Sequence, residues 1–107
     1  MNSREKKLEA FGRLIDIMDE LREKCPWDSE QSFESLRNLT IEETYELADA
    51  ILEKDIKGIK KETGDLLLHI VFYAKIGSES GEFDIAEVCD SLTEKLIFRH
   101  PHVFSDT

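Results

Sequence analysis

Apolar and polar residues alternate with a helical period over the first quarter of the chain. Between residues 3 and 24 the apolar side chains recur at positions i, i+3, i+4 and i+7, which predicts an amphipathic helix. Pro26 predicts the end of this helix, because the residue before a proline avoids helical backbone angles. In the turn that follows, Asp28 is predicted to cap a short helix, with Gln31 three residues further on. The apolar stripe consists of Leu8, Phe11, Leu14, Ile15, Met18 and Leu21.

Capping signals predict where the next two helices begin. Thr40 and Glu43 form the capping-box pair T-x-x-E. This pair predicts a second main helix from Thr40 to about Lys54. Asp55 has the side chain of a helix N-cap, and it predicts a third main helix over residues 56 to about 80. The second half of this helix is apolar on nearly all sides, so we expect it to be the central, buried element.

The end of the chain repeats these signals once more. Gly81 suits the left-handed position that follows a helix. Asp84 and Glu87 form a second capping box and predict a fourth main helix, which ends near Arg99, before Pro101. No stretch of the chain has the period-2 alternation of a strand. The sequence therefore predicts an all-α fold with four main helices in a bundle.

Length, charge and cysteine content narrow the classes of protein that the chain can belong to. A chain of 107 residues fits one compact domain and not two. The formal net charge of −10 repels nucleic-acid backbones and anionic membranes, so we expect neither as a partner. The N-terminal sequence has no apolar secretion signal, and no window is long enough to span a membrane. Together with only two cysteines, these features predict a cytoplasmic protein.

Acidic residues cluster beside the apolar stripe of the second main helix. Glu42, Glu43 and Glu46 are spaced at i, i+3 and i+4, so their side chains are neighbours on the helix surface. Like charges at these spacings weaken a helix by roughly 0.2–0.5 kcal/mol per pair. The arrangement is therefore mildly unfavourable unless a cation joins the three carboxylates.

The third main helix carries acidic residues in line with its buried stripe. Glu62, Asp65 and His69 fall within about 60° of one another on a helical wheel. A partly buried carboxylate needs a partner or must take up a proton. The nearby cations Lys60 and Lys61 are predicted to point elsewhere. A metal ion would resolve this conflict, whereas the alternative is an ordinary solvated acidic face.

The chemistry of these residues favours one kind of metal ion. Carboxylates without thiols are hard oxygen ligands, which suit Mg²⁺, with Mn²⁺ as a substitute. Magnesium commonly shares its coordination shell with substrate phosphates, which points to phosphoanhydride chemistry. A di-iron bundle would use Glu-x-x-His pairs, and this chain has E-x-x-E and E-x-x-D instead.

Five blocks of the sequence resemble the MazG nucleoside triphosphate pyrophosphohydrolases. The resemblance covers about residues 8 to 106 and is most like the N-terminal kind of MazG domain. Its blocks occur in order along the chain, with 15 residues between the E-x-x-E and E-x-x-D pairs. They are CPWD-x-x-Q at 25 to 31, SL at 35 to 36, EETYE at 42 to 46, ETGDLLLHIVFYA at 62 to 74, and KLIFRHPHVF at 95 to 104.

The resemblance implies an all-α fold, a homodimer or higher oligomer, and Mg²⁺-dependent cleavage of NTPs or dNTPs to NMP and pyrophosphate. Such an enzyme would clean up the nucleotide pool of the cell. The residues that the resemblance implies as metal ligands are Glu43, Glu46, Glu62 and Asp65.

Roles in catalysis and substrate binding are also expected, for some of these ligands and for further residues. The expected catalytic residues are Glu42, Glu43 and Glu46, of which Glu42 or Glu46 would take the proton of the attacking water. Lys95 and Arg99 match basic positions that would meet the triphosphate. Trp27 could stack on a nucleobase, and the alternative is that it packs against a helix end.

Two other functions remain open at this point. The chain could be a non-catalytic helical dimerisation or regulatory module, although such a scaffold would not need charge on a buried stripe. It could also be a narrower enzyme of the same superfamily, such as a dCTP or phosphoribosyl-ATP pyrophosphohydrolase. The sequence RHPHVF at 99 to 104 favours the MazG branch.

Overall fold

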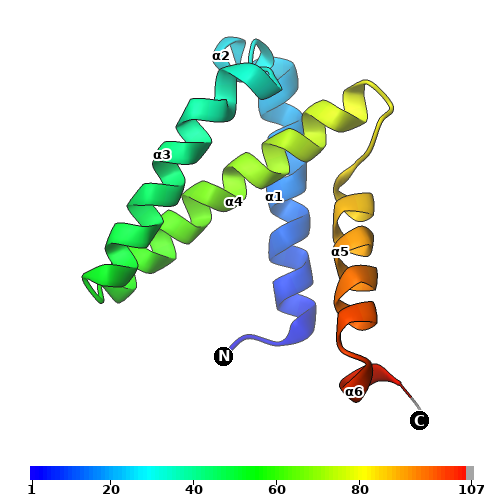
Figure 1. Cartoon of the computed structure of the whole chain (residues 1–107). Coiled ribbons are helices and arrows are strands. Elements are labelled where there is room, and N and C mark those ends of the chain that lie inside the picture. Colours follow the sequence, from blue (N-terminus) through cyan, green and yellow to red (C-terminus); the bar gives the residue numbers. More distant parts are fainter. Residues whose placement is uncertain (106–107) are drawn as a thin grey trace.

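The computed structural model describes residues 1–105, and within this range the chain is helical and has no strand (Figure 1). Four long helices carry the fold, as predicted, and two short helices of one turn each follow the first and the last of them. The all-α prediction is therefore confirmed. The helices are α1 (Arg4–Lys24), α2 (Pro26–Ser29), α3 (Phe33–Leu52), α4 (Ile56–Glu79), α5 (Ile85–Arg99) and α6 (Pro101–Phe104).

Local capping chemistry fixes the starts of α4 and α5, as the sequence predicts. The carboxylate of Asp55 accepts a hydrogen bond of 3.0 Å from the backbone N–H of Gly58. The carboxylate of Asp84 accepts one of the same length from the N–H of Glu87. Gly81 has a φ of +72°, the left-handed conformation that glycine adopts without a steric penalty. These caps satisfy backbone groups that a helix end otherwise leaves unpaired.

The predicted start of α3 is wrong by about two turns. α3 begins at Phe33, where the side chains of Ser32 and Ser35 each accept a hydrogen bond from the other residue's backbone N–H. Because this capping box starts the helix earlier in the chain, Thr40 lies inside α3. Its hydroxyl donates to the carbonyl of Leu36 at 3.0 Å. A T-x-x-E pair inside a helix has no free N–H groups to cap.

The cap predicted at Asp28 is also wrong. Pro26 occupies the first position of α2, and Cys25 is the N-cap, so Asp28 lies within the helix. Proline is favoured at this position because its fixed φ suits a helix start and its missing N–H has no partner to lose. The Gln31 amide donates to the carbonyl of Trp27 at 2.8 Å, which closes the turn after α2.

The hydrophobic core is small and lies where α1 crosses α4, which packs against α3 (Figure 1). Its fully buried residues come from all three helices, and α3 and α4 make the most extensive contact. In contrast, the backbone of α5 comes close only to those of α4 and α6 within the described residues. The core residues are Met18, Leu36, Val71 and Phe72, with Phe11, Leu14, Tyr73 and Ile76 packed around them.

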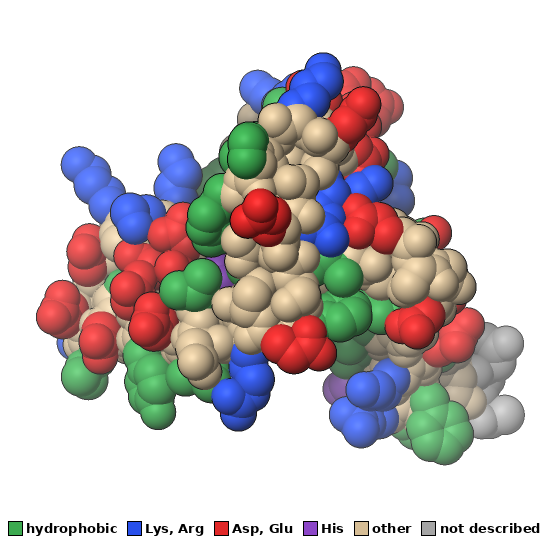
Figure 2. Space-filling view, turned by 90° about the horizontal axis from the view of Figure 1, so that it is seen from above, with side chains coloured by type: hydrophobic (Ala, Val, Ile, Leu, Met, Phe, Trp, Pro, Cys, Tyr) green, Lys and Arg blue, Asp and Glu red, His purple; other side chains and the backbone are tan. Residues whose placement is uncertain are grey.

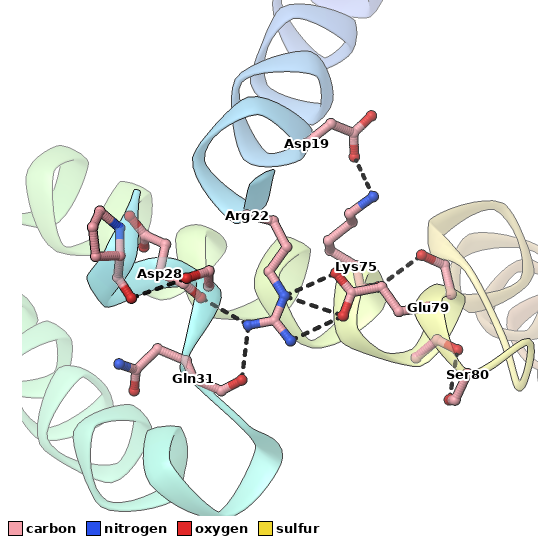
Figure 3. Close-up of polar contacts among 11 residues, drawn as sticks. Asp19, Arg22, Asp28, Gln31, Lys75, Glu79 and Ser80 are labelled. Atoms are coloured by element: carbon pink, nitrogen blue, oxygen red, sulfur yellow. Dashed lines mark hydrogen bonds and ion pairs between the residues drawn. The ribbon is translucent and has the colours of Figure 1, made fainter. Parts of the chain in front are cut away.

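One arginine joins three parts of the fold at the end of α1 (Figure 3). The guanidinium of Arg22 donates to the backbone carbonyls of Asp28 and Gln31, at 2.7 and 2.8 Å. Its other edge binds the Glu79 carboxylate at the end of α4, with Nε 2.8 Å from Oε2. The same group lies 5.9 Å from the centre of the Phe72 ring. Arg22 therefore holds the α2 turn and α4 against α1.

Replacing Arg22 by alanine is expected to destabilise the fold more than removing the charge of its partner. Arg22→Ala loses the ion pair and leaves two carbonyls without their donor, so the free energy of unfolding should fall by about 2–3 kcal/mol. Glu79→Gln keeps the carbonyl bonds, and its loss should be about 0.5–1 kcal/mol, because this pair is partly solvent-exposed. Urea unfolding at one protein concentration measures both, and equal losses would contradict the assigned role of Arg22.

The contribution of Glu79 should also depend on pH. The hydrogen bond from Arg22 lowers the pKa of Glu79 below its ordinary value near 4.5. The unfolded chain therefore takes up the proton first as the pH falls. The stabilisation is complete above the unfolded-state pKa and is lost as the pH falls through the lower folded-state value. Between about pH 6 and pH 3 the wild type should lose more stability than Glu79→Gln in urea unfolding.

Candidate metal centre

The antiparallel packing of α3 and α4 brings three of the four predicted ligands together. Glu43 lies near the middle of α3, and it faces Glu62 and Asp65 in the first half of α4. One carboxylate oxygen from each residue lies within 4.8 Å of the others, and all three residues are half-buried. Glu43 thus meets two residues that are 19 and 22 positions further along the sequence, as the metal-site hypothesis requires.

Two oxygens in this cluster have no hydrogen-bond partner. Oε2 of Glu43 and Oε2 of Glu62 are buried, and neither accepts a hydrogen bond from the described residues. A buried carboxylate oxygen without a donor is destabilising, since it has lost its water and gained nothing in exchange. A divalent cation with oxygen ligands, such as Mg²⁺ or Mn²⁺, would satisfy both atoms. The donor set therefore fits the metal ion that the sequence suggests.

Glu46 lies at the edge of this cluster and not within it. Its side chain is exposed and is not one of the three that share the 4.8 Å group. The charge of Glu43, together with the nearby carboxylate of Glu62, raises the pKa of Glu46. Glu46 is therefore close enough to interact electrostatically with the carboxylates of Glu43 and Glu62. Glu42 is exposed and lies outside the three-residue group.

Lys61 contradicts the prediction that it points away from the acids. Its ammonium donates to Oε1 of Glu62 at 3.2 Å and to Oδ2 of Asp65 at 3.0 Å. Lysine and aspartate four residues apart are neighbours on a helix, and the long lysine side chain can bend back over the adjacent turn. The hydrogen bonds to Asp65 and then to Glu62 raise the pKa of Lys61. In contrast, Lys60 is exposed and makes no ion pair within residues 1–105.

A partly buried polar network lies one turn beyond the acids, and the sequence did not reveal it. Nδ1 of His69 is 2.6 Å from the hydroxyl of Thr40, which also makes a short hydrogen bond with the Tyr73 hydroxyl. Burial lowers the pKa of His69, although the charge of Asp65 opposes this shift. His69 is thus a hydrogen-bonded core histidine. The signal that could have found the network is the i, i+4 spacing of His69 and Tyr73 on the face that carries Asp65.

The predicted substrate-binding residues lie away from the acid cluster within one chain. Lys95 and Arg99 are exposed on α5, which lies across α1 from α3 in Figure 1. Trp27 is 55% exposed in α2, at the N-terminal end of α3. Glu43 lies ten residues after the first residue of α3, or about 15 Å along the helix axis. The fold therefore brings none of the three to the carboxylates.

The surface around the centre is strongly acidic. Figure 2 shows Asp and Glu side chains gathered over the part of the molecule formed by α3 and the start of α4. Lys and Arg side chains lie at its rim. No helix among the described residues is both long enough and apolar enough to cross a lipid bilayer.

Known proteins share this fold and sequence over most of the chain. The chain is 47% identical over 103 residues to the nucleoside triphosphate pyrophosphohydrolase of Escherichia coli (strain K12), which covers 94% of the chain and 39% of that protein. It is 52% identical over 99 residues to the nucleoside triphosphate pyrophosphohydrolase/pyrophosphatase MazG of Thermotoga maritima, covering 91% of the chain and 39% of that protein. The chain thus spans about two fifths of the length of these relatives.

A solved structure and a family model agree with these relatives. The crystal structure of a MazG-related protein from Thermotoga maritima superimposes with a TM-score of 0.77 and 27% identity, over 90% of this chain and 84% of that one. The model of the MazG nucleotide pyrophosphohydrolase domain matches residues 31–104, which include the three clustered carboxylates. The chain therefore belongs to the MazG nucleotide pyrophosphohydrolase domain family.

Proposed function

We propose that this chain is a Mg²⁺-dependent pyrophosphohydrolase that cleaves nucleoside triphosphates between the α- and β-phosphates. The products would be a nucleoside monophosphate and pyrophosphate. The observation that carries the proposal is the pair of buried, unpartnered oxygens on Glu43 and Glu62, within 4.8 Å of a third carboxylate. The relatives named as nucleoside triphosphate pyrophosphohydrolases support the substrate class.

The residues of the cluster would bind the metal ion on which the reaction depends. The ligands of Mg²⁺ would be Glu43, Glu62 and Asp65. Glu46 would be a fourth ligand or would contact the bound ion from the edge of the cluster. When bound, Mg²⁺ would neutralise the triphosphate charge and lower the pKa of nearby water. The dense negative charge of the carboxylates otherwise repels the triphosphate, so substrate should not bind without the ion.

A carboxylate at the edge of the cluster would accept the proton of the attacking water. A water oxygen forms the new bond to the α-phosphorus, and the bond from this phosphorus to the bridging oxygen breaks, so that pyrophosphate leaves. We assign the proton from this water to Glu46, because its carboxylate is exposed at the edge of the cluster, outside the three-residue group. Glu42, on the exposed side of the same helix, is the second candidate for this role.

The shape of the single chain supports a homodimer. Its accessible surface is 8468 Å², whereas a folded monomer of this mass exposes roughly 6,100 Å². Its radius of gyration is 16.3 Å, against roughly 13 Å for a compact domain of this length. Apolar side chains on α3, α4 and α5 are exposed, and green patches mark them in Figure 2. The most exposed of these on the three helices are Tyr45, Leu52, Ile56 and Phe98.

A homodimer also offers a place for the basic residues of α5. In one chain, Lys95 and Arg99 lie on a helix that makes no close backbone approach to α3. We propose that they meet the triphosphate from the partner subunit, so that each active centre uses residues of both copies. Trp27 would act as a base-stacking residue at the periphery. The cellular location that we propose is the cytoplasm.

Neutralising a ligand should abolish turnover and leave the fold intact. Glu43→Gln and Asp65→Asn should each lower the rate of pyrophosphate release from NTPs by roughly 100-fold or more, since each removes a charged ligand. The measurement is a panel of NTPs and dNTPs with and without Mg²⁺. Asp49→Asn, an exposed change on the same helix, is the control and should keep the wild-type rate.

Stability separates loss of chemistry from loss of fold in this experiment. Removing one of several repelling carboxylates should leave the melting temperature in metal-free buffer unchanged or slightly higher. Full activity in either ligand variant would reject the proposed site. Wild-type protein that binds Mg²⁺ but releases no pyrophosphate would instead favour the non-catalytic module.

Mixing two inactive variants tests whether the active centre is shared. Light scattering should give twice the chain mass for the wild type. If Lys95 acts in trans, subunit exchange between Glu43→Gln and Lys95→Gln should restore about a quarter of wild-type activity, because half of the dimers are mixed and each has one intact centre. If Lys95 acts in cis, every centre in the mixture keeps a defect and activity is not restored.

A further inference from the structure

The acid cluster has a cation of its own chain bound at one side. The ammonium of Lys61 lies 3.2 Å from Oε1 of Glu62 and 3.0 Å from Oδ2 of Asp65. The second oxygen of Glu62, Oε2, is buried and has no partner. Glu62 thus offers one oxygen to a lysine side chain that is 69% exposed and the other to the buried centre of the cluster. Lysine and a metal ion would therefore share the same two carboxylates.

We propose that Lys61 sets the affinity of this centre for divalent cations by competing with the metal ion for Glu62 and Asp65. This inference rests on the proposed function, since it takes these carboxylates as metal ligands. In the absence of a divalent ion, the ammonium offsets the mutual repulsion of the acids. When the ion binds, Lys61 must either leave the carboxylates or remain beside a second positive charge. Both outcomes weaken metal binding.

Lys61 could strengthen metal binding by orienting the carboxylates or weaken it by competing for them. The relative size of these two effects decides which outcome is expected. An exposed lysine that only oriented its carboxylates would improve metal binding by about twofold, the usual strength of an i, i+4 ion pair. Two unit charges 4 Å apart in water change an equilibrium constant by about fivefold, and a divalent ion roughly squares this factor. Salt screening at physiological ionic strength reduces the repulsion to about tenfold. Competition is therefore the larger effect.

The chain provides a matched control in the preceding residue. Lys60 has the same side chain and lies on the same helix, but it is about 200° from Glu62 around the helix axis. It makes no ion pair within residues 1–105. Removing its charge changes the net charge of the protein by the same amount as removing that of Lys61. A difference between the two variants therefore reports the contact and not the overall charge.

Calorimetric titration with MgCl₂ tests the proposal on the whole chain. Lys61→Met should bind Mg²⁺ about three- to tenfold more tightly than the wild type. Lys60→Met should change the affinity by less than about twofold, and Lys61→Arg, which keeps the charge, should stay close to the wild-type value. Weaker or unchanged Mg²⁺ binding by Lys61→Met would overturn the proposal, because it would leave only an orienting role or none.

A metal-free measurement keeps this inference separate from the proposed function. Without divalent ions, Lys61→Met should melt about 2–4 °C below the wild type in low salt, since the acids lose their cation. About 1 M NaCl should remove most of this difference by screening the repulsion, whereas Lys60→Met should melt like the wild type. Equal melting temperatures would overturn the role of Lys61 as counter-ion. Failure of the wild type to bind Mg²⁺ would instead reject the metal centre itself.

Discussion

The antiparallel contact between α3 and α4 is the interaction on which the rest of the structure depends. The turn between them is tight: Lys54 adopts a φ of +57°, and the N–H of Asp55 donates to the carbonyl of Ala50 at 3.0 Å. Because so few residues join the two helices, the turn fixes which positions face one another. Glu43 then meets Glu62 as a direct consequence of this register.

Along this helix pair, the character of the contact changes in steps. The acids lie nearest the turn, and the hydrogen bonds among Thr40, His69 and Tyr73 follow, at the same level along α4 as the apolar core around Phe72. The polar network therefore lies between the acids and the far part of the helix pair, and burial lowers the pKa of its histidine. Such a gradient lets carboxylates lie partly buried without entering the core, where the loss of water would neutralise them.

The core of one chain is too small to account for the whole fold. Helix α5 leaves much of its apolar surface exposed, and residues such as Leu92 and Phe98 are 52% and 86% exposed. The hydrophobic effect favours covering this surface, and a second copy of the chain is the occupant that the proposed function requires. The same association would bring Lys95 and Arg99, which lie away from the acid cluster in one chain, to the cluster of the partner. Fold stability and active-centre assembly would then depend on one interface.

The sequence by itself determined the helical class, the caps at Asp55 and Asp84, and the spacing of the acids within each of the two helices, because these features depend on residues within about four positions of one another. The tertiary structure decided the rest. The capping box of Ser32 and Ser35, and not the predicted one at Thr40, starts α3. Thr40 therefore lies inside the helix, where its hydroxyl makes a hydrogen bond with His69 of α4. The contact of Lys61 with Asp65 follows from i, i+4 spacing within one helix, so the sequence could have shown it, whereas packing left α5 away from the carboxylates. Such choices depend on which helices pack together, and local spacing does not encode them.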